Sequence, residues 1–193
     1  MQPLIILSFQ KLVSKLGIGA LMTVSAFSIN IALLSNNAAI AASVEPRFEE
    51  IEQEILWFAR TIYSETKTPA EQTLVAWVIR NRAESGIYPG TYKEVVLEPG
   101  QFSGMHPTDR QYSINVSLDY DDSSPAWDSA LSIARAVYFA DPILRPLPSG
   151  VMHFYSPVSV TRTPSWASVT EPAHVVRDPG NGTVRFAFYA DIM

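Results

Sequence analysis

Residues 68–79, with the sequence TPAEQTLVAWVI, predict a helix buried at the centre of the domain. Thr68 can cap the helix, Pro69 suits its first turn, and Glu71 can reach back from the third position. The run from Leu74 to Ile79 is apolar on every side, as expected of a helix covered all round. Ser85-Gly86 then predicts the end of this helix.

The segment before residue 68 predicts another helix, whose apolar residues form one stripe with spacings of three and four. The next position on this stripe, three residues after Ile62, is Glu65. A carboxyl group is therefore expected at the end of an apolar helix face. The stripe residues are Phe48, Ile51, Ile55, Phe58 and Ile62.

Two further helices and a long loop are predicted after the central helix. Residues 91–94 (TYKE) repeat the capping pattern and open a short helix, which Pro99-Gly100 stops. Residues 101–122 show no period and predict a long loop, of a kind that is often functional. Ser124-Pro125 starts a helix that runs to about Ala140.

The last third of the chain predicts strands. Residues 151–155 are a strand candidate, and residues 173–177 and 183–189 flank DPGNG, residues 178–182, which is typical of a hairpin loop. The predicted fold class is α+β: a mainly helical domain with a small antiparallel sheet in its C-terminal third.

The N-terminus has the composition of an export signal. Lys11 and Lys15 are the only charged residues before Glu45, an apolar run covers residues 16–34, and Ala39-x-Ala41 suits a signal peptidase. Residues 1–41 are therefore predicted to be a signal peptide, or an uncleaved membrane anchor, since the run approaches the ~20 residues that cross a bilayer. Residues 42–193 are predicted to form one exported domain, in the periplasm, cell wall or extracellular space.

Composition narrows the partners and the chemistry. The chain has no cysteine, which excludes disulfides and thiolate catalysis and fits a bacterial envelope. Its net charge is −5 and it has no basic run, so nucleic acid is not an expected partner.

Glu65 is the strongest candidate for chemistry. Burial on an apolar stripe, close to the negative end of a helix, would keep its carboxyl group protonated near neutral pH. That is the state from which a general acid donates a proton to a glycosidic oxygen. The alternative is that Glu65 simply bends into solvent where the helix frays. For Glu71, helix capping is the preferred role.

Other candidates are less specific. Four loop acids could supply a second carboxylate: Asp109, Asp119, Asp121 and Asp122. The three histidines, His106, His153 and His174, lack metal-ligand spacing, so neither a metal nor a cofactor is predicted. Aromatic residues gather in the second half of the chain, where Tyr155 and Trp166 suit the edge of a carbohydrate cleft, while Trp127 and Phe154 are expected in the core.

Six blocks, in order, resemble the SleB-type cell-wall hydrolases of bacterial envelopes and spore cortex. The resemblance spans about residues 56–189. The blocks are ARTIYSE (59–65), AWVIRNR (76–82), EPGQFS (98–103), ALSIARAV (130–137), HFYSP (153–157) and PSWA (164–167).

The resemblance implies a lysozyme-related domain that acts on peptidoglycan as a muramidase or lytic transglycosylase. In that family the glutamate that ends the first block is the catalytic acid, here Glu65. The cleft residues that carry over are Gln101, Phe102, Ser103, Tyr155 and Trp166.

The chain departs from the family pattern at three places. Ser64 stands where the family usually has glycine, Gly104 stands where it often has tryptophan, and the segment after Glu65 is two residues shorter. These departures keep open a non-catalytic protein that binds or regulates the wall. A metal-dependent amidase or peptidase is a further alternative.

Overall fold

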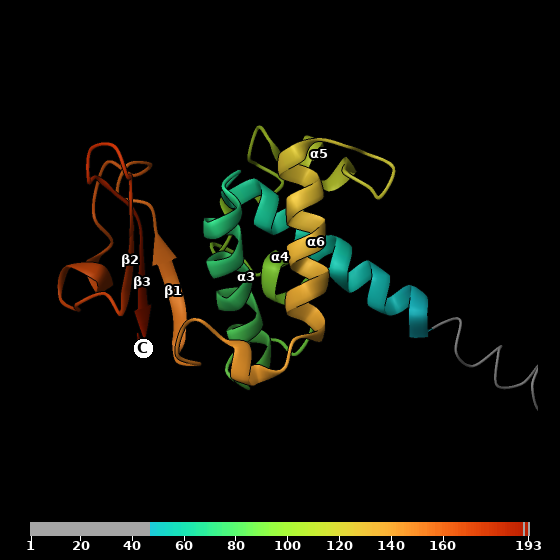
Figure 1. Cartoon of the computed structure of the whole chain (residues 1–193), viewed down its shortest axis with the longest axis horizontal. Helices are drawn as coiled ribbons and strands as arrows, with labels where there is room; N and C mark the ends of the chain where they lie inside the picture. The colour runs from blue at the N-terminus through green and yellow to red at the C-terminus, as the bar shows by residue number, and fades with distance from the viewer. Residues whose placement is uncertain (1–46, 191, 193) are drawn as a thin grey trace, which may run out of the picture. The chain divides into compact units, whose positions relative to one another are not determined.

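Helix α3 (Pro69–Glu84) lies at the centre of the domain, between helix α6 (Pro125–Phe139) and strand β1 (Val151–Tyr155) (Figure 1). The computed structural model describes residues 47–190 and 192, and residues from 50 onward form one compact unit. Val75, Ala76, Val78 and Ile79 are completely buried. The prediction of a central buried helix is therefore confirmed, and it ends where expected, with Ser85 as its C-cap.

The start of α3 differs from the prediction in one respect. Thr68 occupies the N-cap position and Pro69 the first turn, but the Thr68 side chain makes no capping hydrogen bond. Glu71 accepts hydrogen bonds from Thr66 and Arg185 instead of reaching back. The capping role assigned to Glu71 is wrong: the Thr68 backbone amide donates to Oγ1 of Thr66 at 3.2 Å, and the buried Glu71 carboxylate is stabilised by a cation and a hydroxyl group.

Residues 47–65 form the predicted first helix. Ile55, Phe58 and Ile62 are completely buried, so the middle of the predicted stripe faces the core. Phe48 is 61% exposed, which shows that the stripe meets the core only after the first turn. The predicted export segment, residues 1–41, and its apolar run lie outside the described residues. No helix within the described part of the chain is long and apolar enough to cross a bilayer.

The two capped helices that follow α3 begin where predicted. In α4 (Tyr92–Leu97), the Thr91 side chain accepts from the backbone amide of Glu94. In α6, Ser124 accepts from the amide of Trp127, and Trp127 is 1% exposed in the core, as expected.

Residues 101–122 are more ordered than the predicted loop. They contain the short helices η1 (Ser103–Met105) and α5 (Tyr112–Ser117). Met105 is buried, and the buried Asn115 donates a hydrogen bond of 2.9 Å to the carbonyl of Gly104, which joins the two helices. Each helix is too short to produce a recognisable period, so the sequence pattern could not indicate them. Helix η2 (Pro142–Leu144) leads from α6 to the sheet.

The C-terminal third forms an antiparallel sheet in the order β1-β3-β2, with β2 at His174–Arg177 and β3 at Val184–Ala190. This confirms the α+β class and the hairpin across residues 178–182. One face of the sheet packs Phe186 and Phe188 against Val78 of α3. The opposite face, with Ala187 and Tyr189, is covered by η3 (Ser165–Ser168).

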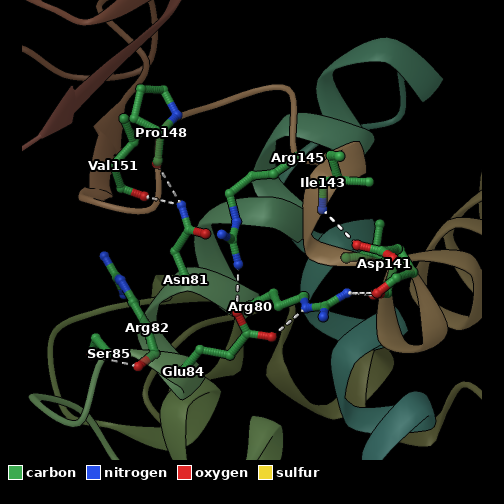
Figure 2. Close-up of polar contacts among 12 residues, drawn as sticks. Arg80, Asn81, Arg82, Glu84, Ser85, Asp141, Ile143, Arg145, Pro148 and Val151 are labelled. Carbon is green, nitrogen blue, oxygen red and sulfur yellow. Dashed lines mark hydrogen bonds and ion pairs between the residues drawn. The ribbon is translucent and has the colours of Figure 1, made fainter.

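Asn81 joins α3 to the start of β1 (Figure 2). Its side-chain amide donates to the carbonyls of Pro148 and Val151 at 3.0 and 2.9 Å, and the residue is 2% exposed. Asn81→Ala leaves both carbonyls without this donor, so we expect a loss of about 1–3 kcal/mol in the free energy of unfolding. Urea denaturation measures it, and Gln53→Ala on an exposed helix face is the control. Equal midpoints for the two variants would contradict the assigned role.

Candidate active site

Glu65 is the last residue of the first helix, one turn after the buried Ile62. The helix ends at Glu65, and Thr68, in which Pro69 disfavours helical geometry, is extended. Protein atoms surround the carboxyl group. The residue as a whole is partly exposed and lines a pocket. Glu65 therefore does not simply fray into solvent.

The pocket has a volume of about 630 Å³, within the range of ~300–1,000 Å³ typical of ligand sites. Its walls come from parts of the chain that are distant in sequence: the ends of the first helix and α3, the segment around η1, the end of β1 with the loop after it, and β3. The residues around Glu65 include Arg82, Gln101, Phe102, Ser103, His106, Thr108, Asp109, Phe154, Tyr155, Ser156, Ser159, Val160 and Phe186.

Burial raises the pKa of Glu65 to about 7, from an ordinary value of 4.5. The positive charges of Arg82 and Lys67 lower this pKa, and the negative charge of Asp109 raises it. Because burial is the largest of these effects, the carboxyl group keeps its proton over a wider pH range than a solvated glutamate does. Glu65 can consequently both donate and accept a proton near neutral pH.

Arg82 is a buried cation in the wall of the same pocket, and the sequence reasoning missed its role. Its Nε donates to the carbonyl of Met152 at 2.6 Å, and its guanidinium carbon lies 5.0 Å from the ring centroids of both Tyr88 and Phe102. Its Nη1 has no hydrogen-bond partner within the described residues. The available signal in the sequence was that Arg82 comes shortly after the apolar run from Leu74 to Ile79, at the end of the predicted central helix.

Replacing Arg82 tests its effect on Glu65. Because the guanidinium favours the ionised carboxylate, Arg82→Gln is expected to raise the pKa of Glu65 above about 7. Carbon-13 NMR titration of the glutamate side chains measures this, and the signal of Glu65 is identified by its loss in Glu65→Gln. Arg135→Gln removes a cation that is paired with Glu52 and should leave the pKa unchanged. A constant pKa in Arg82→Gln would refute this electrostatic coupling.

Asp109 is the one of the four predicted loop acids that lines the pocket. Its Oδ1 accepts from the amide of Gln111 at 2.7 Å, and its own amide donates to the carbonyl of His106 at 2.9 Å, so a local turn holds it. Its negative charge raises the pKa of Glu65. Two carboxyl groups, those of Glu65 and Asp109, therefore line the same pocket.

Five of the six predicted site residues surround the pocket: Glu65, Gln101, Phe102, Ser103 and Tyr155. Trp166 is not among the lining residues. It contacts Tyr155 edge to face at 5.9 Å and Tyr189 at 5.2 Å, so it supports Tyr155 from behind. Phe154, expected in the core, packs against core residues and also lines the pocket.

Two of the departures from the family pattern lie against each other. A Cβ atom at Gly104 would come within 3.0 Å of the Ser64 Cβ and of the Asn115 Nδ2. With serine at position 64, a side chain at position 104 would therefore fit only if Ser64 and Asn115 shifted. Ser64 and Gly104 form a matched pair beside Glu65.

The fold and pocket define an α+β domain with a buried acid in an aromatic-lined cleft. The sequence model for the cell wall hydrolase family matches residues 66–178, and the chain belongs to this family. This confirms the resemblance to the cell-wall hydrolases, and the protein is a cell-wall hydrolase. The matched segment contains five of the six blocks and begins directly after ARTIYSE (59–65).

Among solved structures, the chain is similar to the catalytic domain of the Bacillus cereus SleB protein. The identity is 21%, the TM-score is 0.47, and the match covers 69% of this chain and 88% of that one. A comparison with curated proteins finds no match.

Proposed function

We propose that this domain cleaves the glycan strands of peptidoglycan and that Glu65 is the general acid. The observation that carries the proposal is a carboxyl group with a pKa of about 7 in a cavity of about 630 Å³. A glycosidase needs such a protonated carboxyl group to donate to the leaving oxygen. Tyr155, which is partly exposed, offers an aromatic face against which a sugar ring can pack, whereas Phe102 is 3% exposed and belongs to the wall of the pocket. Gln101 and Ser103 offer hydrogen bonds to sugar hydroxyls.

In the first step, Glu65 protonates the oxygen that bridges N-acetylmuramic acid and N-acetylglucosamine. The carbon–oxygen bond of the muramic acid breaks and leaves an oxocarbenium-like centre. Glu65 is then a carboxylate, and the nearby charges of Arg82 and Lys67 stabilise that ionised form.

The second step has two alternatives that are compatible with this site. In a lytic transglycosylase, the Glu65 carboxylate takes a proton from the muramic acid 6-hydroxyl, whose oxygen closes an anhydro ring. In a muramidase, a second carboxylate activates water or stabilises the oxocarbenium centre. The position of Asp109 on the pocket wall supports the muramidase route.

Digestion of purified sacculi, followed by mass spectrometry of the soluble fragments, tests this proposal. Anhydromuropeptides identify a transglycosylase, and reducing-end muramic acid identifies a muramidase. Saturable binding without fragment release would instead indicate a non-catalytic wall-binding protein. Cleavage in the stem peptide that a chelator abolishes would indicate a metal-dependent amidase or peptidase. Either of the last two results would overturn the proposal.

The proposed site of action is outside the cytoplasm, where peptidoglycan lies. The basic flank, apolar run and Ala39-x-Ala41 of the first 41 residues support export. Cleavage after Ala41 would release a diffusible enzyme, whereas retention of residues 16–34 would attach it to the membrane. N-terminal sequencing of the mature protein distinguishes the two states.

A further inference from the structure

The residue that follows Glu65 is held by a buried polar network. Thr66 is 7% exposed, and its hydroxyl donates to Oε2 of Glu71 at 2.5 Å. Its backbone carbonyl accepts from the side-chain amide of Gln72 at 3.1 Å. Both groups of Thr66 are therefore bonded to α3 directly after the helix that carries Glu65 ends.

The partners of Thr66 are themselves fixed by other parts of the fold. Glu71 is 1% exposed and accepts from Arg185 of β3, from Nε to Oε1 at 2.5 Å and from Nη2 to Oε2 at 3.2 Å. Gln72 is completely buried, donates to the carbonyl of Ala126 at 3.0 Å and accepts from Ser129 of α6 at 2.7 Å. Three elements (α3, α6 and β3) therefore meet at the residue next to Glu65.

The carboxylate of Glu71 in this network stays negatively charged. Burial by itself would raise the pKa of Glu71, but the hydrogen bonds from Arg185 and Thr66 hold this pKa below its ordinary value. Glu71 thus remains an acceptor for the Thr66 hydroxyl across the pH range in which Glu65 changes its protonation. Thr66, Glu71, Gln72 and Arg185 do not line the pocket.

We propose that Thr66 and Glu71 are positioning residues that hold the Glu65 carboxyl group inside the pocket. The inference rests on the proposed function of Glu65 as general acid. Helix ends fray readily, and a glutamate at the last position would otherwise gain water by turning outward. The hydrogen bonds of Thr66 prevent this movement, because they fix the backbone at the first residue after the helix.

Thr66→Val and Thr66→Ser are the matched test. Valine keeps the shape of threonine and removes the donor, whereas serine keeps the hydroxyl group. We expect kcat in Thr66→Val to fall about 10–100-fold, because a misplacement of about 1 Å has effects of this size. KM should stay within about twofold, since the residues that line the pocket are unchanged. Thr66→Ser should restore the wild-type kcat.

Titration of Glu65 by carbon-13 NMR gives a second result, independent of activity. The charged or titratable groups around Glu65 come from four parts of the chain. They are Arg82 on α3, Lys67 in the connecting segment, Asp109 and His106 on the opposite loop, and Tyr155 at the end of β1. None of them is altered by either variant. Thr66→Val should move the pKa of Glu65 from about 7 towards 4.5, because the carboxyl group becomes more solvated. Thr66→Ser should not move it.

Two controls separate positioning from stability. Val137→Ala removes core volume from α6 away from the pocket and should lower stability without changing kcat or the pKa of Glu65. Arg185→Met, on a partly exposed side chain, loosens Glu71 without altering Thr66 and should reproduce a smaller pKa change even if Thr66→Val folds poorly.

If Thr66→Val and Arg185→Met lower stability but keep the wild-type kcat and the wild-type pKa of Glu65, the network only stabilises the fold. The inference then fails. If the wild-type protein releases no glycan fragments, the proposed function fails. The NMR titration then still decides whether Thr66 holds Glu65.

Discussion

Glu65→Gln is expected to release soluble peptidoglycan fragments about 10²–10⁴-fold more slowly than the wild-type protein, because general acid–base groups contribute effects of this size. Glutamine keeps the shape of the side chain and the pocket, but has no proton to donate to the bridging oxygen. Fragment release from purified sacculi measures the rate, and co-sedimentation with sacculi measures binding, which should be retained.

Glu50→Gln is the matched control for this prediction. It removes a carboxylate from an exposed position of the same helix and should leave the rate unchanged. Clearing of sacculi by Glu65→Gln at the wild-type rate would show that another group supplies the proton.

The same substitution should stabilise the fold at alkaline pH. The folded-state pKa of Glu65, about 7, lies above the ordinary value of 4.5, so the folded protein binds this proton more tightly than the unfolded chain does. The wild-type protein therefore loses stability as pH rises from about 4.5 through about 7, where burying the charge opposes folding. At pH 8, Glu65→Gln avoids this loss and should gain up to about 3 kcal/mol in the free energy of unfolding.

Below pH 4.5 the wild-type carboxyl group is protonated in both the folded and the unfolded state. The difference in the free energy of unfolding between Glu65→Gln and the wild-type protein should therefore disappear. Urea denaturation of both proteins at pH 4 and pH 8 measures the change. Glu50→Gln should show no comparable dependence on pH. An equal difference at both pH values would mean that Glu65 titrates in the folded protein like a solvated glutamate.

A slower fragment release and a higher stability at pH 8 in Glu65→Gln would together show that the site loses stability in order to bury a functional carboxyl group. A neutral residue in place of Glu65 would be better for stability and worse for catalysis, a trade-off expected where an ionisable group is buried for its chemistry. Neither result alone has this meaning, since a merely structural glutamate would not affect fragment release.

Local sequence signals predicted the elements that position the site. The spacing of Ile55, Phe58 and Ile62 indicated both the buried helix face and the unusual surroundings of Glu65. Caps at Thr91 and Ser124 marked the starts of α4 and α6, and residues 178–182 marked the hairpin. Each of these signals depends only on residues that are close in sequence. A single sequence was therefore sufficient to predict these helices and the hairpin.

Contacts between distant residues could not be predicted in the same way. Glu71 pairs with Arg185, 114 positions away, and no local pattern distinguishes that arrangement from a helix cap. The convergence of Arg82 and Asp109 on Glu65 likewise depends on how α3 and the η1–α5 segment pack. For Trp166, an aromatic residue in a polar loop gave no indication of whether it would line the pocket or support Tyr155.

We propose that the protonated carboxyl group of Glu65 donates the proton in glycan cleavage. The most direct test of this proposal compares two pH profiles of the wild-type protein: the rate of fragment release, and the NMR titration of the Glu65 side chain. We expect the rate to fall on the alkaline side with a midpoint equal to the titration midpoint of Glu65, near pH 7. A rate that stays constant well above that titration midpoint would contradict it.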